Sequence, residues 1–140
     1  MARSYAQLAA IVFCIVGVGG FLTGDAGTLV NGHASGNFDG VALHMTYVRD
    51  VIDLLLAGAF VYAGFFADRV AGLRTVLGTG AFLLLLAIVG FAVGETETGS
   101  RSIAGLHFTL AINIFDLIAG TLAVLCAFGR LDEAAPTAAR

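Results

Sequence analysis

The sequence predicts an all-α protein, a four-transmembrane-helix bundle built from two tandem helical hairpins that form a parallel repeat. Composition is the first reason: 59% of the 140 residues are hydrophobic, only 12% are charged, and the mean hydropathy is +0.94. A soluble domain carries charge on about a quarter of its residues. The second reason is that the apolar residues form four runs, each long enough for the roughly 20 residues that a span needs. The third is an internal repeat.

The four predicted spans follow one another with short connections. The first run has a counterpart later in the chain, so a span is favoured over a cleaved signal peptide. We expect one transmembrane domain over residues 1–130, with repeats over 5–69 and 74–130, and a flexible cytoplasmic tail over 131–140. The predicted spans are residues 5–23, 41–67, 74–94 and 106–129, and the connections are residues 24–40, 68–73 and 95–105.

The orientation follows from the basic residues, all seven of which are arginine. Five of them fall on one side of a four-span chain, and short arginine-bearing loops stay in the cytoplasm. Both termini are therefore predicted to be cytoplasmic in a multi-pass protein of the cell membrane, with the lipid bilayer as its main partner. The chain has no basic stripe, so no nucleic-acid partner is expected. The five arginines are Arg3, Arg69, Arg74, Arg130 and Arg140, and the opposite loops carry the acidic Asp25, Asp39, Glu95 and Glu97.

Two short patterns recur in the same order in both halves of the chain. The first span ends in a G-F-x-x-G-acid pattern over residues 20–25, and the third ends in the same pattern over residues 90–95. The second and fourth spans open with Leu-His, at His44 and His107, and each reaches an aspartate nine residues after its histidine. Repeated two-span hairpins share one orientation, which predicts a pseudo-two-fold axis along the membrane normal.

Small residues at spacings of three and four mark one face of the first and third spans. Such residues let helix backbones approach each other closely in lipid. We therefore predict that helices pack at Gly17, Gly20, Gly24, Gly90 and Gly94, with Ala87 at the position that matches Gly17.

Polar side chains inside the second and fourth spans form the candidate site. They recur at offsets of zero, four and seven, so each set is expected on one helix face. Arg49 comes four residues before Asp53, within reach of a same-helix ion pair. Counting from the cytoplasmic ends puts Asp53 and Asp116 roughly 21–23 Å from the inner boundary, at one level of the outer leaflet. The predicted polar cluster is Thr46, Arg49, Asp50, Asp53, Thr109, Asn113 and Asp116.

Three interpretations of these residues stay open, because polar groups inside a membrane are costly and need a reason. The first is a paired structural network that fixes helix register. The second is a proton- or cation-linked transport or sensing site that uses Asp53 and Asp116. The third is a haem held by His44 and His107 as axial ligands. No other cofactor and no metal site is expected.

We expect no enzymatic activity, because no Ser-His-Asp or Cys-His set can be assembled from this sequence. The preferred hypothesis is a structural or accessory subunit, which self-associates or binds another membrane protein.

Four short stretches carry a resemblance to a known family. They are the opening Ala2–Leu8, the Gly20-Phe21 pair, the Leu43-His44 pair and the polar Asn113–Asp116 stretch. Through them the chain resembles, over nearly its whole length, a family of small four-span membrane proteins of actinobacterial type known only as a domain of unknown function. The resemblance implies the four-span architecture and no activity.

Overall fold

The computed structural model describes residues 1–27, 29–30, 33–34, 43–96 and 99–128. Within these residues the chain forms four α-helices, and the second runs on into a π-helical turn, η1. The helices are α1 (Ala2–Thr23), α2 (Tyr47–Val61), η1 (Tyr62–Phe66), α3 (Arg69–Val93) and α4 (Leu110–Ala127). The short strands are β1 (Leu29–Val30), β2 (His33–Ala34), β3 (Glu95–Thr96), β4 (Gly99–Ile103) and β5 (Leu106–Phe108).

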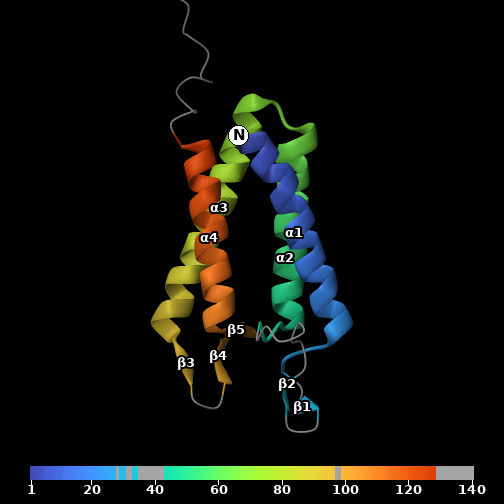
Figure 1. Ribbon diagram of the computed structural model, residues 1–140, viewed down its shortest axis with the longest axis vertical. Coiled ribbons are helices and arrows are strands. Elements are labelled where there is room, and N and C mark those ends of the chain that lie inside the picture. Colours follow the sequence, from blue (N-terminus) through green and yellow to red (C-terminus); the bar gives the residue numbers. More distant parts are fainter. Residues whose placement is uncertain (28, 31–32, 35–42, 97–98, 129–140) are drawn as a thin grey trace, which may run out of the picture.

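The helices form two hairpins. Helix α1 packs mainly on α2, and α3 packs mainly on α4, with fewer contacts between the two pairs. Figure 1 shows the start of α1 and the end of α4 at one end of the bundle, and the strands at the opposite end. There β1 pairs with β2, and β3, β4 and β5 form a second antiparallel sheet in that order. We call this end the strand end.

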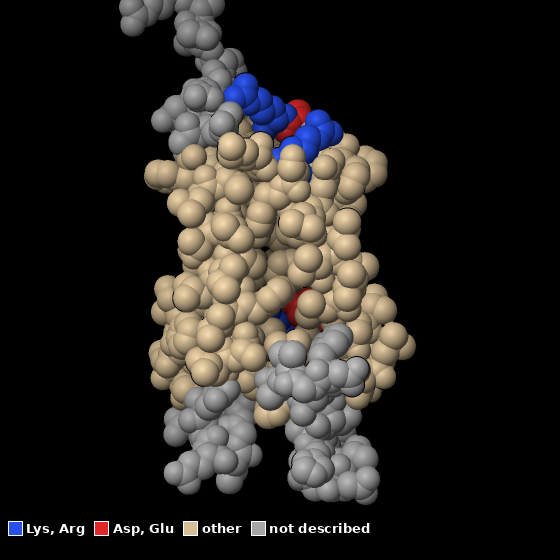
Figure 2. Space-filling view, in the orientation of Figure 1, with Lys and Arg blue, Asp and Glu red and all other residues tan. Residues whose placement is uncertain are grey.

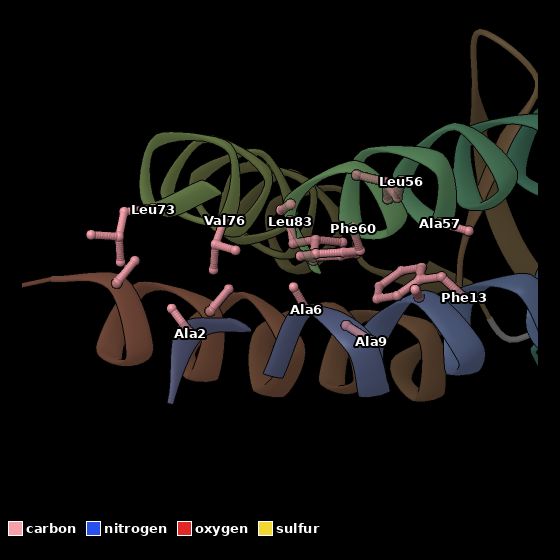
Figure 3. Close-up of a cluster of buried hydrophobic side chains, with 14 residues drawn as sticks. Ala2, Ala6, Ala9, Phe13, Leu56, Ala57, Phe60, Leu73, Val76 and Leu83 are labelled. Atoms are coloured by element: carbon pink, nitrogen blue, oxygen red, sulfur yellow. The ribbon is translucent and has the colours of Figure 1, made fainter. Parts of the chain in front are cut away.

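The core is built from alanines on α1 that face large side chains from the other helices. Ala6 and Ala9 are buried one turn apart, which lets α1 approach its neighbours closely. Phe13 on α1 fills the middle of the bundle, where its ring centroid lies 5.6 Å from that of Phe60 and 5.3 Å from that of Phe115. Figure 3 shows the α1 side chains meeting those of α2 and α3 along this line.

The surface of the bundle is apolar and the interior holds charge, the reverse of a soluble protein. Large hydrophobic side chains such as Leu55, Ile88 and Leu125 are more than half exposed, while four ionisable side chains in the interior are buried. On the face that Figure 2 shows, the middle of the described bundle is almost entirely uncharged. Helices α1, α3 and α4 are each long and apolar enough to cross a membrane. The predicted all-helical membrane protein is confirmed at this level.

Matching residues begin and end the helices of the two hairpins. The Thr46 and Thr109 hydroxyls accept hydrogen bonds from the backbone N–H groups of Arg49 and Ile112, which caps α2 and α4. Gly24 and Gly94 end α1 and α3 with φ angles of 98° and 70°. These backbone conformations favour glycine, which explains the repeated glycine before an acidic residue.

Three of the predicted helix boundaries are wrong. Helix α3 starts at Arg69, because the Asp68 carboxylate accepts a hydrogen bond from the Ala71 N–H (2.9 Å) and caps it; the expected connection over 68–73 is its first turn. Residues 43–46 and 106–109 were expected to be helical, yet His44 has a left-handed φ of 49° and residues 106–108 form β5. Helices α2 and α4 begin only after these residues, at the capping threonines Thr46 and Thr109. The predicted tail over 131–140 and the loop residue Asp39 lie outside the described residues.

A π-helical turn at the far end of α2 fits against the start of α1. The wider turn frees backbone carbonyl groups, and Arg3 Nε and Gln7 Nε2 donate hydrogen bonds to the Gly64 carbonyl at 2.9 and 3.1 Å. A Cβ atom at Gly64 would lie 3.1 Å from the Gln7 backbone nitrogen, so a larger residue here would push α1 slightly away. Arg3 is therefore a structural residue as well as an orientation signal.

Candidate functional site: a buried arginine–aspartate cluster

The centre of the candidate site is the guanidinium of Arg49, which bonds to carboxylates from both hairpins. Its Nη1 donates to Asp116 Oδ2 at 2.9 Å and its Nη2 donates to Asp116 Oδ1, a bidentate pair between α2 and α4. Its Nε donates to Asp53 Oδ2 at 3.2 Å, one turn further along α2. Asp53 Oδ1 also lies 3.2 Å from Nε, but without hydrogen-bond geometry.

Helix periodicity puts these three side chains in the interior. Thr46 starts α2, so Arg49 lies in its first turn and Asp53 one turn later on the same face. Thr109 starts α4 in the same way, and Asp116 follows seven residues later, two turns along. The position that follows the cap by three residues is Arg49 in α2 and Ile112 in α4. The arginine is therefore a feature of the first hairpin alone.

All three groups are buried. Arg49 is 3% exposed and Asp53 and Asp116 are 0% exposed. Buried charges are stable only when they are paired and hydrogen-bonded, which this arrangement achieves for Arg49. Figure 2 shows a small charged patch between apolar side chains, towards the strand end.

Asp50, expected in the same cluster, makes no hydrogen bond to Arg49 and lies against α1. Its side chain is fully buried, and neither carboxylate oxygen has a hydrogen-bond partner among the described residues. The carboxylate packs directly on Gly20, where a Cβ atom would overlap it. The glycine on α1 thus makes room for an acidic side chain on α2.

Asn113 has the same relation to Gly90 in the second hairpin. It is 2% exposed, and a Cβ atom at Gly90 would overlap its amide. Its Oδ1 has no hydrogen-bond partner within the part of the chain that the structure describes. Asp50 and Asn113 therefore occupy matching places, one holding a carboxyl group and the other an amide.

The remaining predicted residues have different roles from those expected. Thr46 and Thr109 were predicted to join the polar cluster, but their hydroxyls cap helices. Gly17 does lie in a helix contact, with a would-be Cβ 2.9 Å from Leu54. Gly24 and Gly94 were predicted to pack helices; both form the positive-φ ends of α1 and α3, and a Cβ atom at Gly94 would meet nothing within 4 Å.

Sequence reasoning missed one close contact between helices. A Cβ atom at Gly80 on α3 would lie 3.1 Å from the Gly120 carbonyl on α4, and one at Gly120 would lie 2.9 Å from the Gly80 carbonyl. The sequence signal was weak: Gly120 is the one glycine of α4, and Gly80 has no glycine three or four residues away in α3, unlike the spaced glycines of α1.

The two histidines lie at the strand end, outside the helices on which they were expected. His44 precedes the α2 cap and His107 is in β5. Burial, followed by the nearby His44, lowers the pKa of His107, and Asp25 partly offsets this. His107 Nδ1 is buried without a hydrogen-bond partner among the described residues. Within the same residues, no three His, Cys, Asp or Glu side chains are grouped to hold a metal ion.

Fold and site together define a class: a small helical membrane protein whose two hairpins are joined by a buried ion pair. Compared with known protein families, curated proteins and solved structures, the chain matches none of them. Its function has to be argued from the site.

Proposed function

We propose that this chain is a four-span, non-enzymatic protein of the cell membrane that acts as a structural or accessory subunit, alone as a homo-oligomer or with another membrane protein. The observation that carries the proposal is the bidentate contact of Arg49 with Asp116. The guanidinium and the Asp116 carboxylate are bonded to each other across the two hairpins, as expected of an ion pair that fixes how the hairpins pack.

The fourth span in this proposal is α2 together with η1. The two run continuously from Tyr47 to Phe66, 20 residues in all, about the length that a span needs. Their outward side chains are apolar, including Val51, Leu55 and Phe66, while the charged ones face inward. Lipid is the environment that suits such a helix.

The cytoplasmic side is proposed to be the end opposite the strands. Arg3, Arg69 and Arg74 are exposed, and Figure 2 shows basic side chains gathered at that end of the described bundle. Short basic segments are retained in the cytoplasm. Both termini would then be cytoplasmic, and the two hairpins would be tandem repeats with one orientation.

Purification from native membranes in mild detergent tests the subunit role. We expect a stoichiometric partner or a defined homo-oligomer in the purified complex. A monomer without a partner, at native abundance and across several mild detergents, would contradict it.

A second function, proton- or cation-linked transport or sensing through Asp53 and Asp116, is favoured by one observation. The cluster holds one arginine against three buried aspartates, and the Asp50 oxygens and Asp53 Oδ1 lack hydrogen-bond donors among the described residues. Intramembrane carboxylates in excess of their partners are typical of ion pathways.

A flux assay separates the two functions. Wild-type protein in liposomes that contain a pH-sensitive or cation-sensitive dye should show no flux above empty liposomes if the cluster is structural. The Asp53→Asn, Asp116→Asn double variant should then fold poorly, because Arg49 loses both partners. A wild-type flux that disappears in a well-folded double variant would favour transport instead.

The third interpretation, a haem on His44 and His107, is tested by an absorption spectrum. Both histidines lie at the strand end, and no helix holds either ring. We expect no Soret band in protein expressed with haem supplied. A Soret band that disappears on His107→Ala substitution would establish the haem site and overturn this expectation.

A further inference from the structure

Asp50 is the buried ionisable group that the structural role of the cluster leaves unexplained. Its side chain is 0% exposed, and its two oxygens have no hydrogen-bond donor among the described residues. A carboxylate without a donor or counter-ion is among the most costly groups to bury. Within the described residues, nothing compensates a negative charge on this carboxyl group.

The charges that face Asp50 make an ionised form still more costly. On its own helix, the nearby groups are Arg49, which is bonded to Asp53 and Asp116, and Asp53 itself. From the segment after α1, Asp25 adds a further negative charge. On α1, the contacts come from Gly17 and Gly20, which carry no charge. With one arginine and three buried aspartates, the cluster has an excess of negative charge if all are ionised.

The second hairpin shows what kind of side chain this place accepts. Asn113 packs on Gly90 as Asp50 packs on Gly20. An amide has nearly the size and shape of a carboxylic acid, and both are neutral when the acid holds its proton. The same packing arrangement is thus occupied by a neutral group in one hairpin and by an acid in the other.

We propose that Asp50 is a proton-binding site, at which the folded bundle holds a neutral carboxylic acid that exchanges its proton with water at the strand end. The occupant is a proton rather than a metal ion, because hard cations need several oxygen ligands. Gly20 fills the space on one side of the carboxyl group, and no three acidic or histidine side chains are grouped there within the described residues. This site goes beyond the structural role of the Arg49 cluster and does not depend on it.

Infrared spectroscopy of the intact protein in lipid bilayers tests the proposal directly. With carbon-13 in the aspartate carboxyl groups, a protonated aspartic acid gives a carbonyl band distinct from carboxylates and from glutamic acids. At neutral pH we expect this band in the wild type, its loss in Asp50→Asn, and its retention in the control Asp68→Asn. Asp68 is exposed at the end opposite the strands, and asparagine caps a helix about as well as aspartate. A wild type without the band, or an Asp50→Asn protein that keeps it, would overturn the proposal.

The converse variant gives a result that does not require Asp50 to be changed. Asn113→Asp puts an acid into the matching place against Gly90, and the isotope-labelled band should about double. An unchanged band in a folded Asn113→Asp protein would show that this packing arrangement does not retain a proton, which contradicts the proposal.

Stability against pH supplies a second readout. If Asp50 keeps its proton in the folded state and releases it in the unfolded state near the ordinary aspartate pKa of about 3.9, the unfolding constant rises by up to about tenfold per pH unit. This rise continues from there to the pH at which the folded protein also loses the proton. Asp50→Asn removes this contribution, whereas Asp68→Asn leaves it in place. Parallel pH profiles for wild type and Asp50→Asn would refute the assignment even if one variant is less stable.

Discussion

Replacing Arg49 with methionine should reveal how strongly the two hairpins depend on one guanidinium. The substitution keeps a long, flexible side chain but removes three hydrogen bonds to Asp53 and Asp116. It leaves two carboxylates buried at 0% exposure without a counter-charge. Breaking a buried pair from one side costs about 3–5 kcal/mol, so Arg49→Met should lower the free energy of unfolding by that amount.

The contact itself is isolated by a double-mutant cycle with Asp116→Asn. Asp116→Asn alone leaves Arg49 with a single carboxylate partner and should also be clearly destabilising. The double variant should cost little more than the worse single variant, which gives a coupling energy of about 3 kcal/mol. Each single change removes the same ion pair, so the two losses cannot add.

The assay can use a reporter that the fold provides. The chain has no tryptophan, and the Tyr5 hydroxyl on α1 donates to the Ala119 carbonyl on α4 at 2.6 Å. Tyrosine fluorescence, in a background with Tyr47 and Tyr62 changed to phenylalanine, reports separation of these helices during denaturation in mixed micelles.

A matched control uses an arginine far from the cluster. Arg74 is exposed near the start of α3. Arg74→Met combined with Asp116→Asn should be additive within about 0.5 kcal/mol. The reasoning is refuted if the Arg49–Asp116 cycle is equally additive.

Three further predictions concern other parts of the molecule. Gly20→Ala and Gly90→Ala should each lower the free energy of unfolding by about 1–3 kcal/mol in the same assay, because the new methyl group overlaps Asp50 or Asn113. The controls are Gly58→Ala and Gly78→Ala, where the new methyl group meets no atom within 4 Å. These two changes should be neutral or slightly stabilising. Equal losses at all four glycines would contradict this. The lowered pKa of His107 means that the unfolded chain binds its proton more readily, so stability should fall as pH drops below about 6.5, and His107→Gln should flatten the acid side of a melting-temperature profile. Parallel profiles would rule out His107 as the cause. Finally, a cysteine at the exposed Ser102, in a protein without Cys14 and Cys126, should react with an impermeant maleimide from outside intact cells, whereas one at the exposed Ser4 should react only after lysis. The reverse pattern would overturn the proposed topology.

Much of the fold could be read from the sequence because lipid imposes simple rules on it. Long apolar runs predicted the helices, and three of them stand out by length and composition alone. The spacing of Arg49 and Asp53 predicted their contact, since residues four apart share a helix face. The matching offsets also predicted that Asp53 and Asp116 lie at one level, and the structure brings both to Arg49.

The sequence could not give the contacts that depend on how helices rotate against each other. By their spacing in the sequence, Asp50 and Asn113 were expected on the same helix faces as Asp53 and Asp116. In the structure each packs instead on a glycine of the neighbouring helix. The bidentate pair between Arg49 and Asp116 joins residues 67 apart in sequence, and no local pattern specifies it.

Helix boundaries failed where apolar residues continue into non-helical backbone. Phe108 is buried in β5, so hydropathy alone extends the fourth span backwards past its true start. The threonine at position 109 was the available signal, because threonine favours the cap over the helix interior. Thr46 gives the same signal for the second span and marks the true start of α2.

Dipolar-recoupling solid-state NMR on the protein in lipid bilayers tests the central claim most directly. With nitrogen-15 in arginine side chains and carbon-13 in aspartate carboxyl groups, the account predicts a short guanidinium–carboxyl contact at the 2.9 Å separation of Nη1 and Oδ2. The Arg49–Asp116 signal should disappear in both Arg49→Met and Asp116→Asn. A contact spectrum unchanged by these two substitutions would contradict the buried pair and, with it, the proposed joining of the two hairpins.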